Sequence, residues 1–171
     1  RRFFVLDRKL RSPRIPLPSR ILGVHRRGKY IILNLDCGRY CALHLRMTGQ
    51  LFFERQITNG KGQMAKRGHE RARFIFSDGS VLRFLDARRF GTIVWCKAGE
   101  LPELGVEPLT PQFAPRIFRH LSEKTKRSIK SFLLDQKKIA GIGNIYADEA
   151  LWAAKIHPLR ESRKLKVAEA R

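Results

Sequence analysis

The stretch Asp135-Gln-Lys-Lys-Ile-Ala-Gly-Ile-Gly-Asn-Ile-Tyr-Ala-Asp-Glu-Ala150 interrupts a helical sequence with two glycines and then resumes it at once. Glycine at Gly141 and Gly143 tolerates a positive φ, so successive backbone N–H groups of this loop can converge on an anion. Asn144 is a favoured N-cap, and the helix after it would add its N-terminal dipole. A plain tight turn with an asparagine cap explains the same residues, so the motif alone leaves both interpretations open.

The charge balance indicates a polyanionic partner. The chain has 171 residues, with 36 Lys+Arg against 15 Asp+Glu and a formal net charge of +21. Such an excess is typical of nucleic-acid binders, although a solvated basic surface or a ribosomal role is open on charge alone. Lys130, Lys137 and Lys138 lie close to the glycine loop in the sequence, which favours phosphate as the group the loop would bind.

Composition narrows the class of protein further. Hydrophobic residues make up 43% of the chain, which is enough to bury a core. No apolar run approaches the length of about 18 residues that a membrane-spanning helix needs, and the N-terminal apolar run is too short for a signal peptide. The cysteines form no CxxC pair and the five histidines show no metal spacing, so we expect reduced cysteines and no metal in this chain.

Residues 1–100 are predicted to form strands, because β-branched and aromatic residues alternate with turn signals there. The expected strands cover 29–36, 40–47, 50–54, 71–76, 81–85 and 92–96, with an Asp-Gly hairpin turn at 77–80 and a long polar loop at 57–68. Many short strands at this spacing predict an antiparallel sandwich or barrel.

After a linker predicted at 101–114, rich in Gly, Pro and acidic residues, the apolar period becomes helical. Pro115 is predicted to open a helix that runs to about Lys124. A short second helix would bury Ile129, Phe132 and Leu133. A third helix would cover 145–155 with Ala147, Leu151 and Ala154 on one stripe, and a fourth would begin after Ser162.

Asp86-Ala-Arg-Arg-Phe-Gly91 is the second informative stretch. Two adjacent arginines cannot both point into a core, so Arg88, Arg89 and Phe90 are predicted to form a loop tip with one apolar wedge beside two cations. Such side chains can enter a DNA stack, where the ring fills a gap and the guanidinium pairs with an exposed base. The alternative is a strand end that buries Phe90 in the core.

Two further stretches leave their alternatives open. Met47 follows a strand in His44-Leu-Arg-Met-Thr-Gly49, as an adaptable apolar tip would, but an ordinary core methionine fits equally. His25-Arg-Arg-Gly-Lys-Tyr30 places basic residues before a strand, as many surfaces do. Lys29 at the strand start could instead be fixed against a phosphate or a reacting sugar.

At these residues the sequence resembles the formamidopyrimidine-DNA glycosylase and endonuclease VIII family of base-excision repair enzymes, and its formamidopyrimidine branch in particular. The matching segments occur in the family's order, with similar gaps, across nearly the whole chain. They are HRRGKY (25–30), HLRMTGQL (44–51), DARRFGT (86–92), LGVEPL (104–109) and IKSFLLDQKKIAGIGNIYADEALWAAKIHP (129–158).

The resemblance implies an α+β fold with two domains that clamp bent DNA. An N-terminal antiparallel β-sandwich, residues 1–100, would be followed by a helix–two-turn–helix (H2TH) domain, residues 115–171. The implied partner is double-stranded DNA with an oxidised purine such as 8-oxoguanine, or with an abasic site. The implied protein is a monomer of the bacterial cytoplasm without membrane contact.

The resemblance also implies roles for single residues. Met47, Arg88 and Phe90 match the family's void-filling trio, with Arg88 facing the orphaned cytosine, and Lys29 matches its essential lysine near the lesion. Glu149 matches a glutamate near the active site. The positions that match DNA-contacting residues are His44, His69, Arg88, Arg89, Lys126, Lys130, Gly143 and Asn144.

Two family features do not occur among these residues. The family's nucleophile is an N-terminal proline in a Pro-Glu-Leu-Pro-Glu segment, whose amine forms a Schiff base and drives β- and δ-elimination. The C-terminal zinc finger, which holds one zinc ion in the full-length protein, is also absent from this chain. We therefore expect a sequence truncated at both ends, without complete catalysis. A catalytically inactive module that binds damaged DNA is the alternative.

Overall fold

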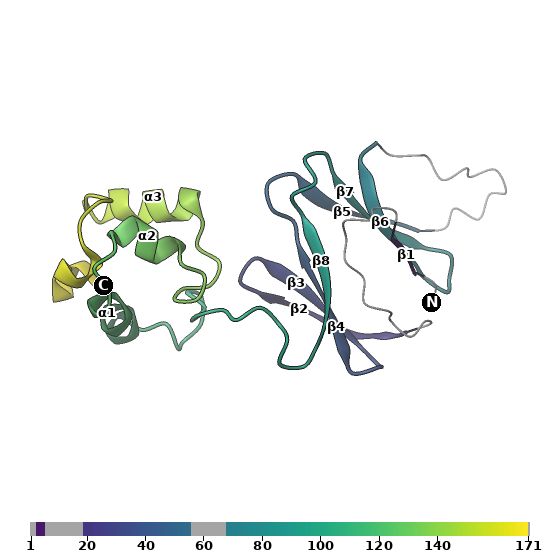
Figure 1. Cartoon of the computed structure of the whole chain (residues 1–171), viewed down its shortest axis with the longest axis horizontal. Helices are drawn as coiled ribbons and strands as arrows, with labels where there is room; N and C mark the ends of the chain where they lie inside the picture. Colours follow the sequence, from purple (N-terminus) through teal and green to yellow (C-terminus); the bar gives the residue numbers. More distant parts are fainter. Residues whose placement is uncertain (1–2, 6–18, 56–67, 171) are drawn as a thin grey trace. The chain divides into compact units, whose positions relative to one another are not determined.

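The computed structural model describes residues 3–5, 19–55 and 68–170 (Figure 1). The chain divides into two compact units. The first comprises Arg1–Arg26 and Tyr30–Leu101, and the second comprises Arg27–Lys29 and Pro102–Arg171. The short segment Arg27–Lys29 therefore belongs to the unit formed by the C-terminal part of the chain, although in the sequence it connects two strands of the first unit.

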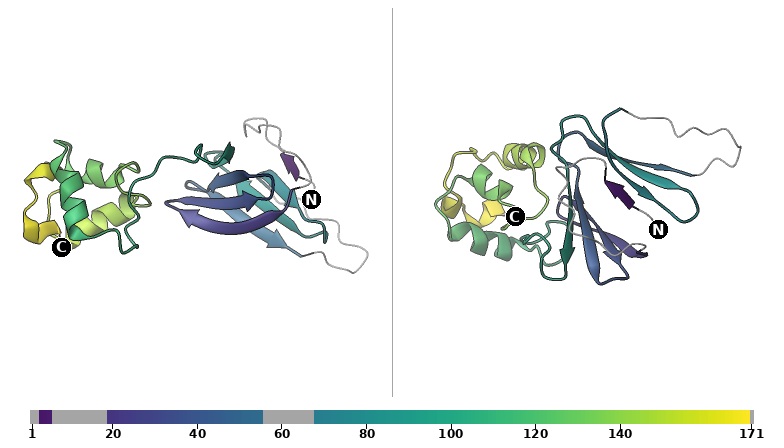
Figure 2. Two further views of the ribbon diagram at one scale, coloured as in Figure 1. Left: turned by 90° about the horizontal axis from the view of Figure 1, so that it is seen from below. Right: turned by 45° about the vertical axis from the view of Figure 1, so that its right-hand side comes forward.

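The first unit is an antiparallel β-sandwich, as the sequence predicted, with two sheets that Figures 1 and 2 show as separate layers. One sheet has the strand order β1 (Phe3–Val5), β6 (Glu70–Ile75), β7 (Val81–Asp86) and β5 (Gly49–Glu54). The other has the order β2 (Ile21–Arg27), β3 (Tyr30–Leu35), β4 (Arg39–His44) and β8 (Thr92–Lys97).

The core of the sandwich follows from the two-residue period of its strands. Cys41 and Leu43 alternate on β4 and are fully buried, and they share one apolar cluster with Phe84 from the opposite sheet. The rings of Phe74 and Trp95, one from each sheet, have centroids 6.3 Å apart. Burial of such large apolar surfaces between the layers is the main stabilising term of this unit.

An ion-pair network is built into the first sheet. The Arg83 side chain is fully buried and donates from Nε to Glu54 Oε2 at 2.9 Å and from Nη1 to Glu70. Burial alone would lower the pKa of this guanidinium, but the two glutamates outweigh burial and raise it. The guanidinium and the two carboxylates compensate one another, so removing the Arg83 side chain or its partners would leave an uncompensated charge in the sheet.

Several strand predictions were incomplete. Strands β1 and β2 were not predicted, and His25 and Arg26 lie within β2 rather than before the first strand. The strand predicted over 40–47 ends at His44, because the Gly49 N–H donates to the Leu45 carbonyl at 2.9 Å and closes a tight turn. The Asp-Gly turn is confirmed, with Gly79 at φ +78°. Residues 57–67 of the predicted loop lie outside the described residues.

The second unit is helical. Its elements are α1 (Pro115–Glu123), α2 (Ile129–Leu134), α3 (Asn144–Ala153) and two 3₁₀ turns, η1 (Ser162–Lys164) and η2 (Val167–Ala170). The three α-helices agree with the sequence prediction, and Pro115 occupies the start of α1. The face of α2 that carries Ile129, Phe132 and Leu133 is buried.

Two helix predictions were wrong in detail. The fourth helix is replaced by η1 and η2, because Leu165 adopts an extended conformation, which lets its side chain enter the helical core. The buried Ser162 hydroxyl also donates to the Thr125 carbonyl at 3.0 Å, which holds the chain away from a regular helix. Ala154, predicted on the buried stripe of the third helix, is the exposed C-cap of α3.

Residues 104–106, from the segment predicted as a linker, are hydrogen-bonded within the second unit. The Gly105 N–H donates to the Gln136 carbonyl at 2.9 Å, and the Ala140 N–H donates to the Val106 carbonyl at 2.8 Å. Val106 thereby forms a parallel bridge with Ile139. This short pairing fixes the backbone just before the glycine loop that begins at Gly141.

Replacing Phe132 tests how much the helical core depends on its central ring. Phe132 is 1% exposed and packs edge-on against Phe118 at 5.6 Å, so Phe132→Ala should cost about 3–5 kcal/mol of unfolding free energy. Urea unfolding followed by circular dichroism at 222 nm measures this loss. Trp152→Ala is the control, because Trp152 is 84% exposed and should change stability by less than about 0.5 kcal/mol. Similar losses in both variants would contradict the assigned core.

Candidate nucleic-acid interface

Three exposed side chains meet at one end of the sandwich. Met47, Arg88 and Phe90 come from two loops that are distant in sequence, and both Met47 and Phe90 are more than half exposed. Arg88 Nη1 lies 3.5 Å from Met47 Sδ, and the Arg88 guanidinium lies 4.9 Å from the centroid of the Phe90 ring. The structure therefore forms an apolar tip with a cation at its centre, and it does not bury Phe90 or Met47 in the core.

The loops that carry these side chains hold strained backbone conformations. Arg46 has φ +53° and Arg89 has φ +60°, both in the left-handed region that residues with a Cβ seldom adopt. Gly91 closes the second loop where a Cβ would lie 2.4 Å from the Phe84 ring, so no larger residue fits there without displacement. Non-glycine strain of this kind clusters at functional sites more often than elsewhere.

A buried carboxylate lies beneath the tips. Asp86 is 1% exposed, accepts the Thr48 hydroxyl on Oδ1, and accepts the Gly91 N–H on Oδ2 at 2.7 Å. Burial alone would raise the pKa of Asp86. Hydrogen bonds from Thr48 and from the amides of Gly91, Arg88 and Phe90 outweigh burial and hold that pKa below its usual range. The carboxylate is therefore ionised at neutral pH.

The two histidines predicted to contact DNA lie near this end of the sandwich. His69 is exposed, has φ +66°, and accepts the Asp86 N–H on its carbonyl at 2.9 Å. His44 is only 9% exposed, and its Nδ1 accepts the Arg46 N–H at 3.0 Å, so its ring supports the turn that carries Met47. This burial makes His44 a less accessible group than the sequence suggested.

In the second unit, the glycine loop is closed by one amide side chain. Gln136 donates from Nε2 to the Ile142 carbonyl at 2.7 Å and accepts the Gly141 N–H on Oε1 at 2.9 Å. Gly141 has φ +90°, as predicted for a glycine in this loop, whereas Gly143 is extended at φ −118°. The N-cap of α3 is Gly143 and not Asn144, which is the first helical residue; no side chain caps this helix end.

Lys29 lies against the same loop. Its Nζ donates to the Ile142 carbonyl at 3.1 Å, and a Cβ at position 143 would lie only 2.8 Å from that nitrogen. Arg27 secures the segment, because its guanidinium donates to Glu107 at 3.0 Å and to the carbonyls of Leu104 and Gly105. An ammonium group beside the N-terminal end of α3, with its outward N–H groups, forms a region suited to an anion.

The remaining predicted residues of this unit are exposed to different degrees. Lys126 is exposed in the connection between α1 and α2, and Glu149 is exposed on α3. Lys130 is half-buried and paired with Asp148, with an Nζ–Oδ1 distance of 2.7 Å. Any phosphate that binds Lys130 must therefore compete with a carboxylate on α3.

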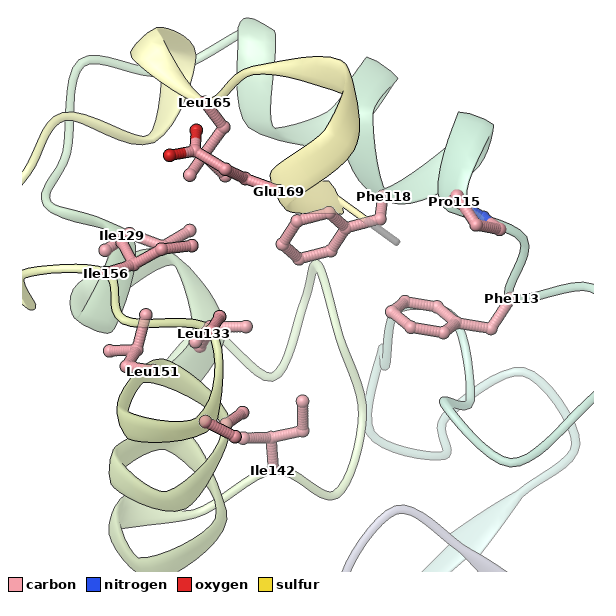
Figure 3. Close-up of a pocket in the computed structure, with 13 residues that line it drawn as sticks. Phe113, Pro115, Phe118, Ile129, Leu133, Ile142, Leu151, Ile156, Leu165 and Glu169 are labelled. Atoms are coloured by element: carbon pink, nitrogen blue, oxygen red, sulfur yellow. The ribbon is translucent and has the colours of Figure 1, made fainter.

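A cavity in the helical unit does not contribute to this site. About 450 Å³ in volume, it is lined almost entirely by apolar side chains of α1, α2, α3 and the C-terminal turns (Figure 3). Its one polar lining residue, Glu169, is bound by Arg160 at 2.7 Å, and this contact lowers the pKa of the Glu169 carboxyl. Apart from this paired carboxylate its lining is apolar, so the cavity lies within the apolar core of the helical unit.

The described residues do not fit a zinc site. They bring together no group of three His, Cys, Asp or Glu side chains that could hold a metal ion. Cys41 and Cys96 are buried thiols whose pKa values burial raises, which disfavours the thiolate that zinc needs. Within the described residues, no helix has the length and apolarity that spanning a bilayer demands.

Three residues of this site were missed by the sequence analysis. Asp86 and Gln136 lie inside the stretches that were singled out, but nothing in their spacing shows which loop they hold. Asp148 follows Lys130 by 18 positions, and only the packing of α2 against α3 brings them together. The sequence signal that could have indicated Asp86 is an acidic residue at the end of an apolar strand, separated by one residue from the Arg-Arg-Phe-Gly loop.

Comparison with known proteins yields one family match for the N-terminal part of the chain and another for the C-terminal part. Residues 17–93 match the formamidopyrimidine-DNA glycosylase N-terminal domain, and residues 104–171 match the H2TH domain of the same enzyme. Formamidopyrimidine-DNA glycosylase from Mycoplasma pneumoniae is 40% identical over 154 residues, which are 86% of this chain and 54% of that protein. The Moorella thermoacetica protein is 43% identical over 85% of this chain and 53% of its own length.

Solved structures agree with the sequence matches. The Lactococcus lactis glycosylase bound to DNA with an AP site has a TM-score of 0.77 and 32% identity, covering 89% of this chain and 58% of that one. MutM from Thermus thermophilus has a TM-score of 0.75 and 38% identity, and the match covers 90% of this chain and 55% of that one. An antiparallel sandwich followed by an H2TH unit defines the fold class. The chain belongs to the formamidopyrimidine-DNA glycosylase family, and it spans about half the length of the curated relatives it matches.

The ionisation of Asp86 makes a testable contribution to stability. Because its folded pKa lies below its unfolded pKa, the carboxylate stabilises the fold above about pH 4 and loses this effect as pH falls through the folded pKa. Asp86→Asn should therefore be less stable than the unmodified chain by about 1–3 kcal/mol at pH 7, with a smaller gap near pH 3. Urea titrations of both proteins at the two pH values measure the gap, and a gap that widens in acid would contradict this ionisation.

Proposed function

We propose that this chain provides the damage-recognition part of a base-excision repair enzyme that removes oxidised purines from DNA. The complete activity would be that of a bifunctional glycosylase and AP lyase: the damaged nucleotide is flipped out, its base is released, and the sugar is cleaved by β,δ-elimination. The observation that carries the proposal is the meeting of Met47, Arg88 and Phe90 at one exposed tip. Related enzymes have been solved in complexes with AP-site DNA and with FAPY-dG DNA.

The chemistry of the tip fits an emptied position in a base stack. Everting a nucleotide leaves a gap between apolar base faces and an unpaired base on the other strand. A thioether and an aromatic ring replace lost stacking at little desolvation cost, because both are already apolar. A guanidinium between them can donate two hydrogen bonds to the orphaned base, as arginine does with base edges. We assign Arg88 to this role and Arg89 to the adjacent backbone.

The cations of both units would hold the phosphates. In the helical unit, Lys29, Lys126 and Lys130 would act with Gly143, Asn144 and the first amides of α3, since a helix N-terminus attracts phosphate. In the sandwich, His69 is exposed beside the tip, and His44 would act from beneath it. The net charge of +21 favours binding that is mainly electrostatic and weakens steeply with salt.

The covalent steps need an amine that attacks C1′ of the sugar. In the family this amine belongs to a proline in a Pro-Glu-Leu-Pro-Glu segment, and no such segment occurs among these 171 residues. The remaining groups suited to help are the Lys29 ammonium near the sugar and the Glu149 carboxylate as an acid or base, neither of which replaces that nucleophile. We therefore assign recognition, and not complete catalysis, to these residues. The alternative is an inactive module that binds damaged DNA.

Borohydride trapping separates recognition from catalysis. The 171-residue chain is incubated with an 8-oxoguanine duplex or an abasic duplex and reduced, and any Schiff base becomes a covalent adduct visible by denaturing electrophoresis. We expect no adduct but preferential binding of the abasic duplex. An adduct would show that a nucleophile is present after all. If the chain shows no preference for either damaged duplex, the recognition role is wrong.

Removing the aromatic wedge should change selectivity more than affinity. Phe90→Ala is expected to reduce the preference for an abasic over an unmodified duplex by about tenfold, because stacking on a base contributes roughly 1–3 kcal/mol. Fluorescence anisotropy with both duplexes measures this ratio. Phe53→Ala is the matched control, since Phe53 is 57% exposed on β5. Lys126→Ala should reduce the affinity for both duplexes equally, because a phosphate contact does not depend on the base. Equal losses for Phe90→Ala on both duplexes would exclude the wedge.

A further inference from the structure

We propose that Asp86 is the positioning residue of the damage-recognition tip: it sets the mutual arrangement of Met47, Arg88 and Phe90 from beneath, without touching DNA. The inference rests on the recognition role proposed above and names the group that makes it possible. A positioning role requires that one side chain bind both loops, that the loops need restraint, and that the contact matter for selectivity more than for folding.

Asp86 meets the first requirement, because each of its carboxylate oxygens serves a different loop. Oδ1 accepts the hydroxyl of Thr48, the residue next to Met47. Oδ2 accepts the Gly91 N–H at 2.7 Å, directly after Phe90. The Arg88 N–H also lies 3.4 Å from Thr48 Oγ1, so Thr48 contacts both the carboxylate and the second loop. One buried charge therefore joins two loops that are 38 residues apart.

The main chain of Asp86 extends this control to a third loop. Its N–H donates to the carbonyl of His69 at 2.9 Å, and its own carbonyl accepts Arg71 Nε at 2.8 Å. His69 is exposed next to the tip and is one of the residues assigned to DNA. The side chains proposed to read the lesion in this unit thus depend on contacts that all converge on Asp86.

The loops need this restraint because their backbones are strained. Arg46, His69 and Arg89 all have positive φ values although none is glycine, and each lies in a loop that ends on Asp86 or on its partners. Without hydrogen bonds to the carboxylate, the loops of Arg46 and Arg89 would relax toward ordinary conformations, which would separate Met47 from Arg88 and Phe90. An asparagine at position 86 has one acceptor oxygen and an NH₂ group that only donates, so at least one loop would lose its anchor.

Asp86→Asn preserves the size of the side chain and is the direct test. The probes are an unmodified duplex and a duplex with a tetrahydrofuran abasic analogue beside 2-aminopurine, whose fluorescence reports whether a wedge has entered the stack. We expect Asp86→Asn to bind the unmodified duplex within about twofold of the unchanged chain. Its preference for the abasic duplex should fall about fivefold or more, with a smaller 2-aminopurine signal at saturation.

Two further variants complete the test. Asp78→Asn is the matched control, because Asp78 makes the same kind of contact, to the Ser80 N–H at 3.0 Å, in the turn at the other end of β7, and it should leave preference and signal unchanged. Thr48→Val removes one donor and keeps the charge, so it should reduce the preference about twofold. If Asp86→Asn does not fold, the loss of preference in Thr48→Val decides the question.

The outcomes separate this inference from the proposed function. Equal loss of affinity for both duplexes in Asp86→Asn, or an unchanged preference and an unchanged 2-aminopurine signal, would overturn the positioning role while the unchanged chain still selects the abasic duplex. No selection by the unchanged chain would overturn the recognition role, and the positioning role with it.

Discussion

A carboxylate that is removed from water must accept hydrogen bonds on both oxygens, and the sandwich satisfies this constraint at Asp86 with donors from two separate loops. The position of the carboxylate is itself fixed, because Asp86 ends β7 in register with Gly49 of β5. The sheet therefore transmits its rigidity to the loop tips through one charged group. Side chains that would be mobile on unsupported loops are held at distances set by the core beneath them.

In the helical unit, a neutral side chain rather than a charged one fixes the conformation of a loop. Gln136 both donates and accepts within the glycine loop, and so closes it in one conformation. Its partner, the Ile142 carbonyl, also accepts Lys29 Nζ, so the position of the ammonium depends on the conformation of the loop. A neutral amide leaves the positive potential of the α3 N-terminus intact, whereas a carboxylate at this place would oppose any phosphate.

Features coded by local sequence were predictable. Pro115 at a helix start, the Asp-Gly turn and the apolar period of α2 are short-range signals, and the structure confirms each. The stripe predicted on α3 is confirmed at Ala147 and Leu151 but not at Ala154. The resemblance of short segments indicated the residues of the tip. Strand β2 was missed although it lies beside β3, the next strand in the sequence, because it is mostly exposed and ends in His25–Arg27 rather than in apolar residues. Strand β1 was missed because its existence depends on a distant partner, as in the pairing of Phe3 with Phe74. The role of Asp86 was hidden for the same reason, since its donor Thr48 is remote in sequence.

The extent of helices was harder to predict than their existence. Gly143 takes the N-cap that asparagine propensity assigned to Asn144, which is instead the first residue of α3. The chain after Ser162 forms 3₁₀ turns because Leu165 is drawn into the core. At Leu165 a contact with distant residues of the core overrides the local preference, and no single-sequence pattern contains that contact.

The left-handed arginines at 46 and 89 carry one more implication, which concerns how the chain trades folding against binding. Glycine would relax each position by about 1 kcal/mol, because it has no Cβ to collide with the carbonyl. A protein with glycine at both positions would be more stable, yet it would lose two exposed cations next to Met47 and Phe90. Selection of variants for thermostability alone would therefore favour glycine at positions 46 and 89 and would remove both of these positive charges.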